Sequence, residues 1–384
     1  MNGSRGPKIA LVAIGLGRVQ RGFERYFTDL FQVLRDELDI TLYKSRGANG
    51  AQESVPPLLQ TATAVARRLP LAKAIGTREY NRDCIAYGLT LLPDLLRKRY
   101  DVVHCIDPPL AHVLARLQRT IPFRSRLLFT EGCVMPVHYY PPVAHIHHVA
   151  PGSLQLAQDA GFAADRMTLV PCGIHSERFA TSLDRAQLRK KYSVAENTFV
   201  VLAVSAVKRE HKRVDYIVEE VSKLKGDVLL WIDGNPEDAA VVELARRRVG
   251  ERCRITHVDS ADIPELYRLS DVLVHASLTE AFGLVLVEAA ASGLMVLAHD
   301  SPHFRWLLQE HECVVDMSTP GALSTRLRDL MHQGKPSEDS LRERATSARR
   351  RFDWACLRDA YVSMYCQVAE YRSPAALQLQ EIPS

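Results

Sequence analysis

The chain has 384 residues, 47% of them hydrophobic and 24% charged, with a formal net charge of +4 at pH 7. This is the composition of an ordinary soluble globular protein, and the length suits two domains of common size. The mild positive charge suits a nucleotide-phosphate ligand or an anionic membrane surface but requires neither. The eight cysteines are scattered without a C-x-x-C or metal-binding spacing, so we expect reduced thiols and a cytoplasmic protein.

No segment of the sequence is predicted to cross a membrane. The apolar run after Lys8 (IALVAIGLG) ends in Gly17-Arg18 without a small-x-small cleavage site, which favours a buried first strand over a signal peptide. Residues 281–298 are apolar, but Glu288 lies in their middle, and a carboxylate at the centre of a bilayer is too costly for a spanning helix.

Short apolar runs alternate with helical patterns in both halves of the chain. Runs rich in Val, Ile and Leu between helices are typical of parallel strands buried on both faces. Two such sets predict an α/β protein with two doubly wound, Rossmann-like domains that face each other across a cleft. The predicted strands cover residues 8–14, 40–43, 101–106, 126–129, 145–149 and 167–170 in the first half, and 199–204, 228–232, 254–258, 271–276, 294–298 and 313–315 in the second.

The turn after the first strand contains Gly15, Gly17 and Gly22. A loose set of glycines is weak evidence for phosphate binding, and a plain tight turn is the alternative interpretation. The helix that follows should bury one apolar stripe, made of Phe23, Phe27, Leu30, Phe31 and Leu34.

Residues 67–99 carry eight basic side chains against three acidic ones. With the apolar residues Leu91, Leu92, Leu95 and Leu96, this segment could contact an anionic membrane, although a solvated helix face is the simpler interpretation. Aromatic residues are sparse among the basic ones, so we expect no nucleic-acid binding.

Two further features of the first half could carry chemistry. Glu131 ends a predicted strand and is followed by Gly132. Several histidines lie nearby, but they lack the carboxylate or cysteine spacing of a metal site, so we expect core or surface histidines and no bound metal. These histidines are His138, His145, His147 and His148.

A dense group of cations, Lys208-Arg209-Glu210-His211-Lys212-Arg213, directly follows the predicted strand at 199–204. Such neighbours repel one another unless an anion is close by, so the loop is either an anion site or a solvated surface loop.

The most informative stretch is Ser277 to Glu288 (SLTEAFGLVLVE), which joins a predicted strand to a predicted helix starting near Gly283. A helix that begins with glycine after a strand leaves free backbone N–H groups, and these can hold a diphosphate. Glu288 lies one turn beyond Leu284, roughly 6 Å along the axis at ~1.5 Å per residue. The alternative is a buried strand–helix corner with two solvated acids, Glu280 and Glu288.

The segment SLTEAFGLVLVEAAASGLMVLAHD resembles the E-x7-E signature of the family 4 glycosyltransferases, which are retaining enzymes with the GT-B fold. The resemblance implies that Glu280 contacts the transferred sugar and that Glu288 binds the ribose of the donor nucleotide. It also implies that the amides of Phe282, Gly283 and Leu284 hold the diphosphate.

The resemblance extends, more weakly, to other parts of the chain. Lys212 matches the family lysine that holds the donor diphosphate, and Arg209 is our choice for the accompanying arginine, with Lys208 as the alternative. Gly17 and Gly22 are candidates for donor binding, although the family pattern Gly-Gly-x-Glu is here Arg21-Gly22-Phe23-Glu24. Glu131 stands where the family has a histidine that lines the reaction site.

The implied organisation is an N-terminal acceptor-side domain (1–175), a C-terminal donor-side domain (176–353), a helix (354–372) that crosses back to the first domain, and a tail (373–384). That helix should bury Trp354, Leu357, Tyr361, Tyr365 and Val368, and the linker matches the family at Pro171, Gly173 and Phe179.

We expect a nucleotide-sugar-dependent glycosyltransferase acting on a glycan, lipid or small-molecule acceptor, without a cofactor or a catalytic metal, since no Asp-x-Asp occurs. No residue stands out as a covalent nucleophile, which fits the front-face displacement proposed for the family. A nucleotide-sugar epimerase of similar fold and a non-catalytic nucleotide-sugar-binding protein are the alternatives.

Overall fold

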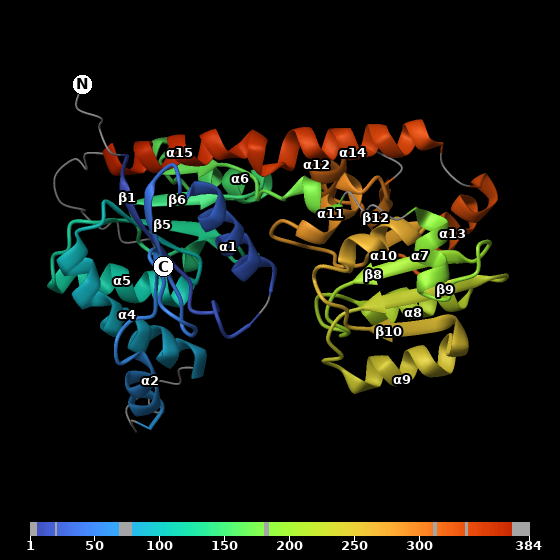
Figure 1. Cartoon of the computed structure of the whole chain (residues 1–384), viewed down its shortest axis with the longest axis horizontal. Coiled ribbons are helices and arrows are strands. Elements are labelled where there is room, and N and C mark those ends of the chain that lie inside the picture. The colour runs from blue at the N-terminus through green and yellow to red at the C-terminus, as the bar shows by residue number, and fades with distance from the viewer. Residues whose placement is uncertain are drawn as a thin grey trace. The chain divides into compact units, whose positions relative to one another are not determined.

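The computed structural model describes residues 6–19, 21–68, 79–179, 184–309, 313–334 and 337–370. The chain forms two compact units (Figure 1). The N-terminal unit comprises Met1–His148, Leu156–Val170 and Arg358–Ser384, and the C-terminal unit comprises Val149–Gln155 and Pro171–Leu357. The predicted tail, residues 373–384, lies outside the described residues.

The N-terminal unit contains a parallel sheet of seven strands in the order β3-β2-β1-β4-β5-β6-β7. Every strand predicted for this half is present, and the short edge strand β3 was not predicted. The strands are β1 (Lys8–Val12), β2 (Asp39–Tyr43), β3 (Glu53–Ser54), β4 (Val102–Cys105), β5 (Arg126–Glu131), β6 (His145–His148) and β7 (Met167–Leu169).

The helices of this unit bury apolar residues against the sheet or against a neighbouring helix. In α1 the stripe buries Phe27, Leu30, Phe31 and Leu34 as predicted, but Tyr26 is fully buried where Phe23 is only half-buried. The helices assigned wholly or partly to this unit are α1 (Gly22–Leu34), α2 (Leu59–Arg68), α4 (Glu79–Lys98), α5 (Pro108–Thr120), α6 (Pro151–Asp159) and α15 (Trp354–Glu370).

A buried chain of hydrogen bonds ties the C-terminal part of α15 to the sheet. The Tyr365 hydroxyl lies 2.7 Å from Nδ1 of His104, whose Nε2 lies 2.5 Å from the Thr130 hydroxyl. The Thr130 hydroxyl also lies 2.8 Å from Nδ1 of His147, and Nε2 of His147 donates to the carbonyl oxygen of Val170 at 2.8 Å. The chain satisfies these buried polar groups, which would otherwise destabilise the core.

The C-terminal unit contains a parallel sheet of six strands in the order β10-β9-β8-β11-β12-β13. Every strand predicted for this half is present. The strands are β8 (Phe199–Val204), β9 (Val228–Asp233), β10 (Cys253–Thr256), β11 (Val272–His275), β12 (Met295–His299) and β13 (Val314–Val315). The helices are α7 (Arg185–Lys191), α8 (Val214–Ser222), α9 (Ala239–Arg248), α10 (Ile263–Leu269), α11 (Leu284–Ala291), α12 (Pro302–Leu308), α13 (Ala322–Gln333) and α14 (Glu338–Phe352).

Gly173, in the predicted linker, allows a close contact within the C-terminal unit. A Cβ atom at this position would lie 2.3 Å from the indole ring of Trp354, so a larger residue would displace the ring. The neighbouring Ile174 donates to the carbonyl oxygen of Phe352 and forms a parallel bridge with Asp353. The start of α15 is therefore fixed to this segment.

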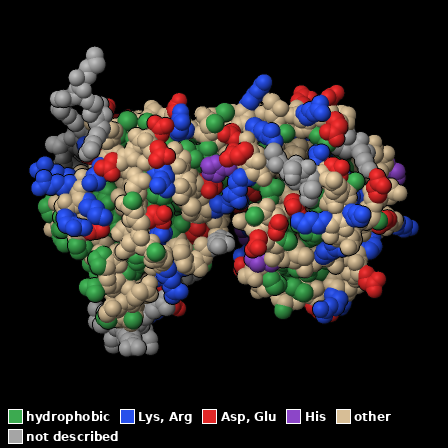
Figure 2. Space-filling view, in the orientation of Figure 1, with side chains coloured by type: hydrophobic (Ala, Val, Ile, Leu, Met, Phe, Trp, Pro, Cys, Tyr) green, Lys and Arg blue, Asp and Glu red, His purple; other side chains and the backbone are tan. Residues whose placement is uncertain are grey.

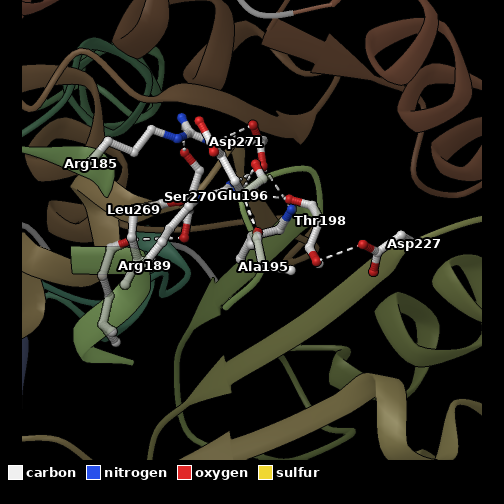
Figure 3. Close-up of polar contacts among 11 residues, drawn as sticks. Arg185, Arg189, Ala195, Glu196, Thr198, Asp227, Leu269, Ser270 and Asp271 are labelled. Atoms are coloured by element: carbon white, nitrogen blue, oxygen red, sulfur yellow. Dashed lines mark hydrogen bonds and ion pairs between the residues drawn. The ribbon is translucent and has the colours of Figure 1, made fainter. Parts of the chain in front are cut away.

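Arg189 joins α7 to two other chain segments of the C-terminal unit, residues 195–198 and 269–271 (Figure 3). Its buried guanidinium donates to Oδ2 of Asp271 at 2.8 Å and to backbone carbonyl oxygens of Leu269, Ala195, Glu196 and Thr198. Asp271 also accepts from Arg185 and from the backbone N–H of Val200. These contacts anchor the start of β11 beside β8.

Both interpretations of the α4 leucines, a solvated helix face and a membrane contact, are wrong for three of them. Leu91, Leu92 and Leu95 are buried, because α4 packs this face against the unit's interior, and only Leu96 is exposed. Figure 2 shows hydrophobic side chains on the surface over α2 and α4. On α4 the exposed aliphatic residues include Ile85, Leu89 and Leu96. Within the described residues, no helix is both long and apolar enough to cross a membrane.

We predict that Arg189→Met lowers the free energy of unfolding by about 3–5 kcal/mol, because it leaves the carboxylate of Asp271 and several carbonyl oxygens without their buried donor. Arg185→Met is the matched control, since Arg185 pairs with the same carboxylate but is more exposed, and it should cost about 1 kcal/mol or less. Urea denaturation measures both. Equal losses would show that the buried guanidinium has no special role.

We also predict that stability declines as the pH falls below about 6.5. Burial lowers the pKa of His147 to about 3 and that of His145 and His148 to about 4, and it lowers the pKa of His104 as well. The unfolded chain therefore binds more protons than the folded one between pH 6.5 and about 4, which costs up to about 1.4 kcal/mol per pH unit for each histidine. Denaturation at pH 7.0, 6.0 and 5.0 measures the slope, and His147→Asn should reduce it. A flat profile would contradict the neutral, buried assignment.

Candidate functional site

The candidate site lies where the order of strands in the C-terminal sheet reverses. β8 and β11 are neighbours and run parallel, with Val201 opposite Val272 and Leu202 opposite Leu273. Their carboxyl ends therefore lie at the same edge of the sheet. In open α/β sheets, ligands bind at such a reversal point. The loop after β8 carries the cation group, and the loop after β11 carries Glu280.

Glu280 is at the centre of a compact polar cluster. Nζ of Lys212 donates to its Oε1 at 2.6 Å, and Nε2 of His275 lies 2.8 Å from the same oxygen. Nε2 of His211 lies 3.2 Å from it. The Glu280 side chain is only 12% exposed. The sequence predicted Lys212 and Glu280 as site residues, and the structure brings them into direct contact.

The electrostatics of the cluster favour an ionised Glu280. Burial alone raises the pKa of this carboxyl group, but the hydrogen bond from His275 and the charge of Lys212 outweigh burial and hold the pKa well below its ordinary value. Burial lowers the pKa of His275, which opposes its protonation even beside the carboxylate. The cluster thus pairs a carboxylate with a lysine and a buried imidazole.

The loop that carries Lys212 has an unusual backbone. Both neighbours of Lys212 adopt left-handed conformations, with φ of 64° at His211 and 50° at Arg213. Such conformations cost non-glycine residues on the order of 1 kcal/mol or more, so the surroundings must hold them. Arg213 contributes to this, because its guanidinium donates to the carbonyl oxygens of Ala276 and Met317. Arg213 therefore fastens the lysine loop to the end of β11.

The turn before α11 presents backbone N–H groups at this edge. Gly283 has φ of 100° and precedes the helix as its N-cap, and no side chain in the described part of the chain caps it. The first N–H groups of a helix have no partner within the helix, and they attract anions. Nε2 of His303 donates to the carbonyl oxygen of Phe282 at 2.9 Å and so orients the peptide group that leads into Gly283.

The side chain of Phe282 itself is buried in an aromatic cluster with Trp306 and Phe352. Only its backbone can serve the predicted role in diphosphate binding. Leu284 is the first residue of α11, as the predicted start near Gly283 requires.

Glu288 lies one turn into α11 and is only 2% exposed. The Tyr267 hydroxyl donates to its Oε2 at 3.1 Å. Glu288 is therefore a buried carboxylate that forms a hydrogen-bonded pair with the Tyr267 phenol. Its predicted contact with a ribose stays a prediction.

The two candidates for the second cation point to different partners. Arg209 is largely exposed, lies 3.6 Å from Asp215, and lines an open pocket with Tyr216 and Glu219. Lys208 donates to Glu237, which follows β9, at 2.9 Å. Neither contacts Glu280 in the structure, so the choice of Arg209 stays a prediction.

Of the predicted residues of the N-terminal unit, Gly17 and Gly22 follow β1, and Glu131 ends β5. Gly17 has φ of 79°, and a Cβ atom there would lie 2.3 Å from the carbonyl oxygen of Arg46, so tight backbone packing explains this glycine. Gly22 is the exposed first residue of α1. Glu131 is buried at the end of β5, opposite His148 of β6. Their roles in a reaction stay predictions.

Sequence reasoning included His211 only as one cation of the loop, and it missed His275, His303 and Tyr267. His275 carried a usable signal, because it is a histidine at the carboxyl end of an otherwise aliphatic strand, where ligands bind. Among the residues that the structure describes, no group of three His, Cys, Asp or Glu side chains is placed to hold a metal ion.

Two parallel sheets of seven and six strands, covered by helices, define an α/β protein of the GT-B class. A glycosyltransferase structure from Rickettsia africae ESF-5 matches with a TM-score of 0.72 at 18% identity, over 96% of this chain and 100% of that one. HepE from Anabaena, solved in complex with UDP-glucose, matches with a TM-score of 0.71 at 17% identity, over 93% and 98%. The predicted fold class is confirmed.

Residues 184–350 match the family model described as glycosyl transferases group 1. Over this region the predicted resemblance is confirmed. The N-acetyl-alpha-D-glucosaminyl L-malate synthase of Bacillus anthracis is 32% identical over 31% of this chain and 32% of its own length. The D-inositol 3-phosphate glycosyltransferase of Xylanimonas cellulosilytica is 27% identical over 55% and 54%. The chain thus spans about half or less of the length of these curated relatives.

Proposed function

We propose that this protein is a glycosyltransferase that moves a sugar from a nucleotide-sugar donor to an acceptor hydroxyl, with retention of anomeric configuration. One observation carries the proposal: Lys212 and Glu280, which the family resemblance assigns to opposite parts of the donor, meet beside the uncapped start of α11. A lysine and free helix N–H groups suit a diphosphate, and a carboxylate suits sugar hydroxyls.

The proposed roles follow from this chemistry. When the bond between the sugar and the diphosphate breaks, negative charge develops on the oxygen that leaves. Lys212, assisted by Arg209, stabilises that charge together with the amides of Phe282, Gly283 and Leu284. Preorganised donors of this kind act mainly on the transition state, so their removal slows the chemical step.

The remaining candidate residues position the donor and the acceptor. Glu280 accepts hydrogen bonds from the sugar, and Glu288 accepts them from the ribose. We keep Gly17, Gly22 and Glu131 as proposed site residues of the N-terminal unit. The names of two relatives, an N-acetyl-alpha-D-glucosaminyl L-malate synthase and a D-inositol 3-phosphate glycosyltransferase, support a small-molecule acceptor, although glycan and lipid acceptors belong to the same proposal.

Three further features belong to the proposal. Catalysis needs no bound metal and no cofactor beyond the donor, so activity should survive EDTA. The protein works in the cytoplasm, which the eight free thiols support. Retention is tested by the anomeric coupling constant of the product in proton NMR.

A panel of nucleotide sugars, each incubated with the protein in the absence of acceptor, tests the proposed reaction. A transferase should slowly hydrolyse one donor and release its nucleoside diphosphate. Conversion of the donor into an isomeric nucleotide sugar would instead identify an epimerase. Binding without any turnover, also in the presence of candidate acceptors, would identify a non-catalytic protein.

For the assignment of roles, we predict that Lys212→Ala lowers turnover at saturating donor by on the order of 100- to 1000-fold, or ~3–4 kcal/mol. Glu280→Gln should abolish most transfer but leave nucleoside diphosphate affinity unchanged or higher, because it frees Lys212 from its ion pair. Lys191→Ala is the matched control, since Lys191 also pairs with a glutamate but lies on the surface. If Lys212→Ala turns over within a few-fold of wild type, Lys212 has no catalytic role and is only a surface charge.

A peripheral membrane contact, proposed for a lipid acceptor, would use the exposed α4 residues Ile85, Leu89 and Leu96, followed by Arg97 and Lys98. The wild type should sediment with vesicles that contain anionic lipid, and high salt should release it from them. The Ile85→Ser/Leu89→Ser variant should bind at least several-fold more weakly. Equal sedimentation of the variant and the wild type would remove this face from the proposal.

A further inference from the structure

His275 is a buried imidazole placed against the carboxylate of the candidate site. It ends β11, where the preceding residues Val272, Leu273 and Val274 form the core, and it is itself 4% exposed. Its ring packs edge-on against Phe304 at 6.2 Å between centroids. Its position is therefore set by a strand in the middle of the sheet and by a neighbouring aromatic ring.

The contact with Glu280 determines which nitrogen of His275 carries the proton. Nε2 lies 2.8 Å from Oε1 of Glu280, and an ionised carboxylate can only accept hydrogen bonds. Burial lowers the pKa of the imidazole, so at neutral pH the neutral ring with a single N–H group is favoured. That group is Nε2–H, and Nδ1 carries no proton.

Lys212 and His275 hold the same oxygen of Glu280 in different ways. The lysine reaches Oε1 with a long flexible side chain from a loop, whereas the histidine reaches it from a strand. Under the proposed function, Lys212 must also serve the diphosphate, which competes with Glu280 for its ammonium group. The bond from His275 does not depend on the donor. All three basic contacts use Oε1, so the second oxygen, Oε2, is the one available for a sugar hydroxyl.

We propose that His275 is a positioning residue that holds Oε1 of Glu280 and thereby directs Oε2 toward a hydroxyl group of the donor sugar. The inference rests on the proposed function, since it assigns Glu280 to the sugar. It makes His275 a determinant of how the sugar, and not the nucleotide, is held.

Three substitutions at position 275 separate positioning from simple packing. His275→Gln places an amide N–H close to the position of Nε2, His275→Asn places it about one bond short, and His275→Phe keeps the ring volume without a donor. Loss of the bond should misplace the carboxylate by about 1 Å, which costs on the order of 100-fold in rate. We expect kcat/KM to fall by about that factor in the Phe and Asn variants and to recover to within about ten-fold of wild type in the Gln variant. Nucleoside diphosphate affinity, measured by calorimetry, should stay within about two-fold throughout.

Several outcomes would overturn the proposal. A folded Gln variant as slow as the Phe variant would show that the N–H group is not what matters. A parallel loss of nucleoside diphosphate affinity would reduce His275 to a packing residue. If the Phe variant fails to fold, the Gln and Asn variants still decide the question.

The tautomer of His275 can also be measured by NMR, which does not depend on turnover. In the wild type, nitrogen-15 NMR of the imidazoles should show His275 as a neutral Nε2–H tautomer, and Glu280→Ala should shift the Nε2 resonance. A tautomer protonated at Nδ1 would contradict the inference even if the enzyme transfers sugar. A wild type that turns over no nucleotide sugar, but shows the predicted tautomer, would instead refute the proposed function and leave the His275–Glu280 contact established.

Discussion

The parallel pairing of β8 with β11 is the constraint on which the candidate site depends. These strands are separated by about seventy residues of sequence, yet their pairing brings the loops that follow them to one edge of the sheet. Lys212 on one loop can therefore meet Glu280 on the other. The pairing is itself secured from its opposite end, where Asp271 accepts from Arg185, Arg189 and the backbone N–H of Val200. A stable, buried anchor at one end of β11 thus allows a polar, strained arrangement at the other.

In the N-terminal unit, too, a carboxylate connects the two loops at the point where the strand order reverses, but the residues differ. Its strand order reverses between β1 and β4, and there the carboxylate of Asp107 accepts from the backbone N–H of Ile14 at 2.9 Å. Burial raises the pKa of Asp107, while hydrogen bonds from Tyr80 and Ile14 oppose the rise. In each unit the carboxylate of one loop accepts a hydrogen bond from the other loop. The donor is the backbone N–H of Ile14 in the N-terminal unit and the ammonium group of Lys212 in the C-terminal unit.

The sequence was sufficient for the strands and the helix-start turn because these depend on local patterns. Buried parallel strands appear as continuous aliphatic runs, and Gly283 marks a turn that needs a positive φ. It was insufficient for contacts made across the fold. The five bonds of Arg189, the bond between His275 and Glu280, and the burial of Leu91, Leu92 and Leu95 depend on which elements pack together. The edge strand β3 was missed because two residues carry no periodic signal.

The measurement that tests the account most directly is hydrogen–deuterium exchange with and without a saturating nucleoside diphosphate. If the diphosphate binds between Lys212 and the start of α11, amides within residues 205–214 and 277–290 should exchange more slowly, with the largest effect at Leu284 and Val285. Peptides from the surface helix α9 serve as the internal reference and should not change. Protection confined to residues 13–22 of the N-terminal unit, with none at the start of α11, would contradict the central claim.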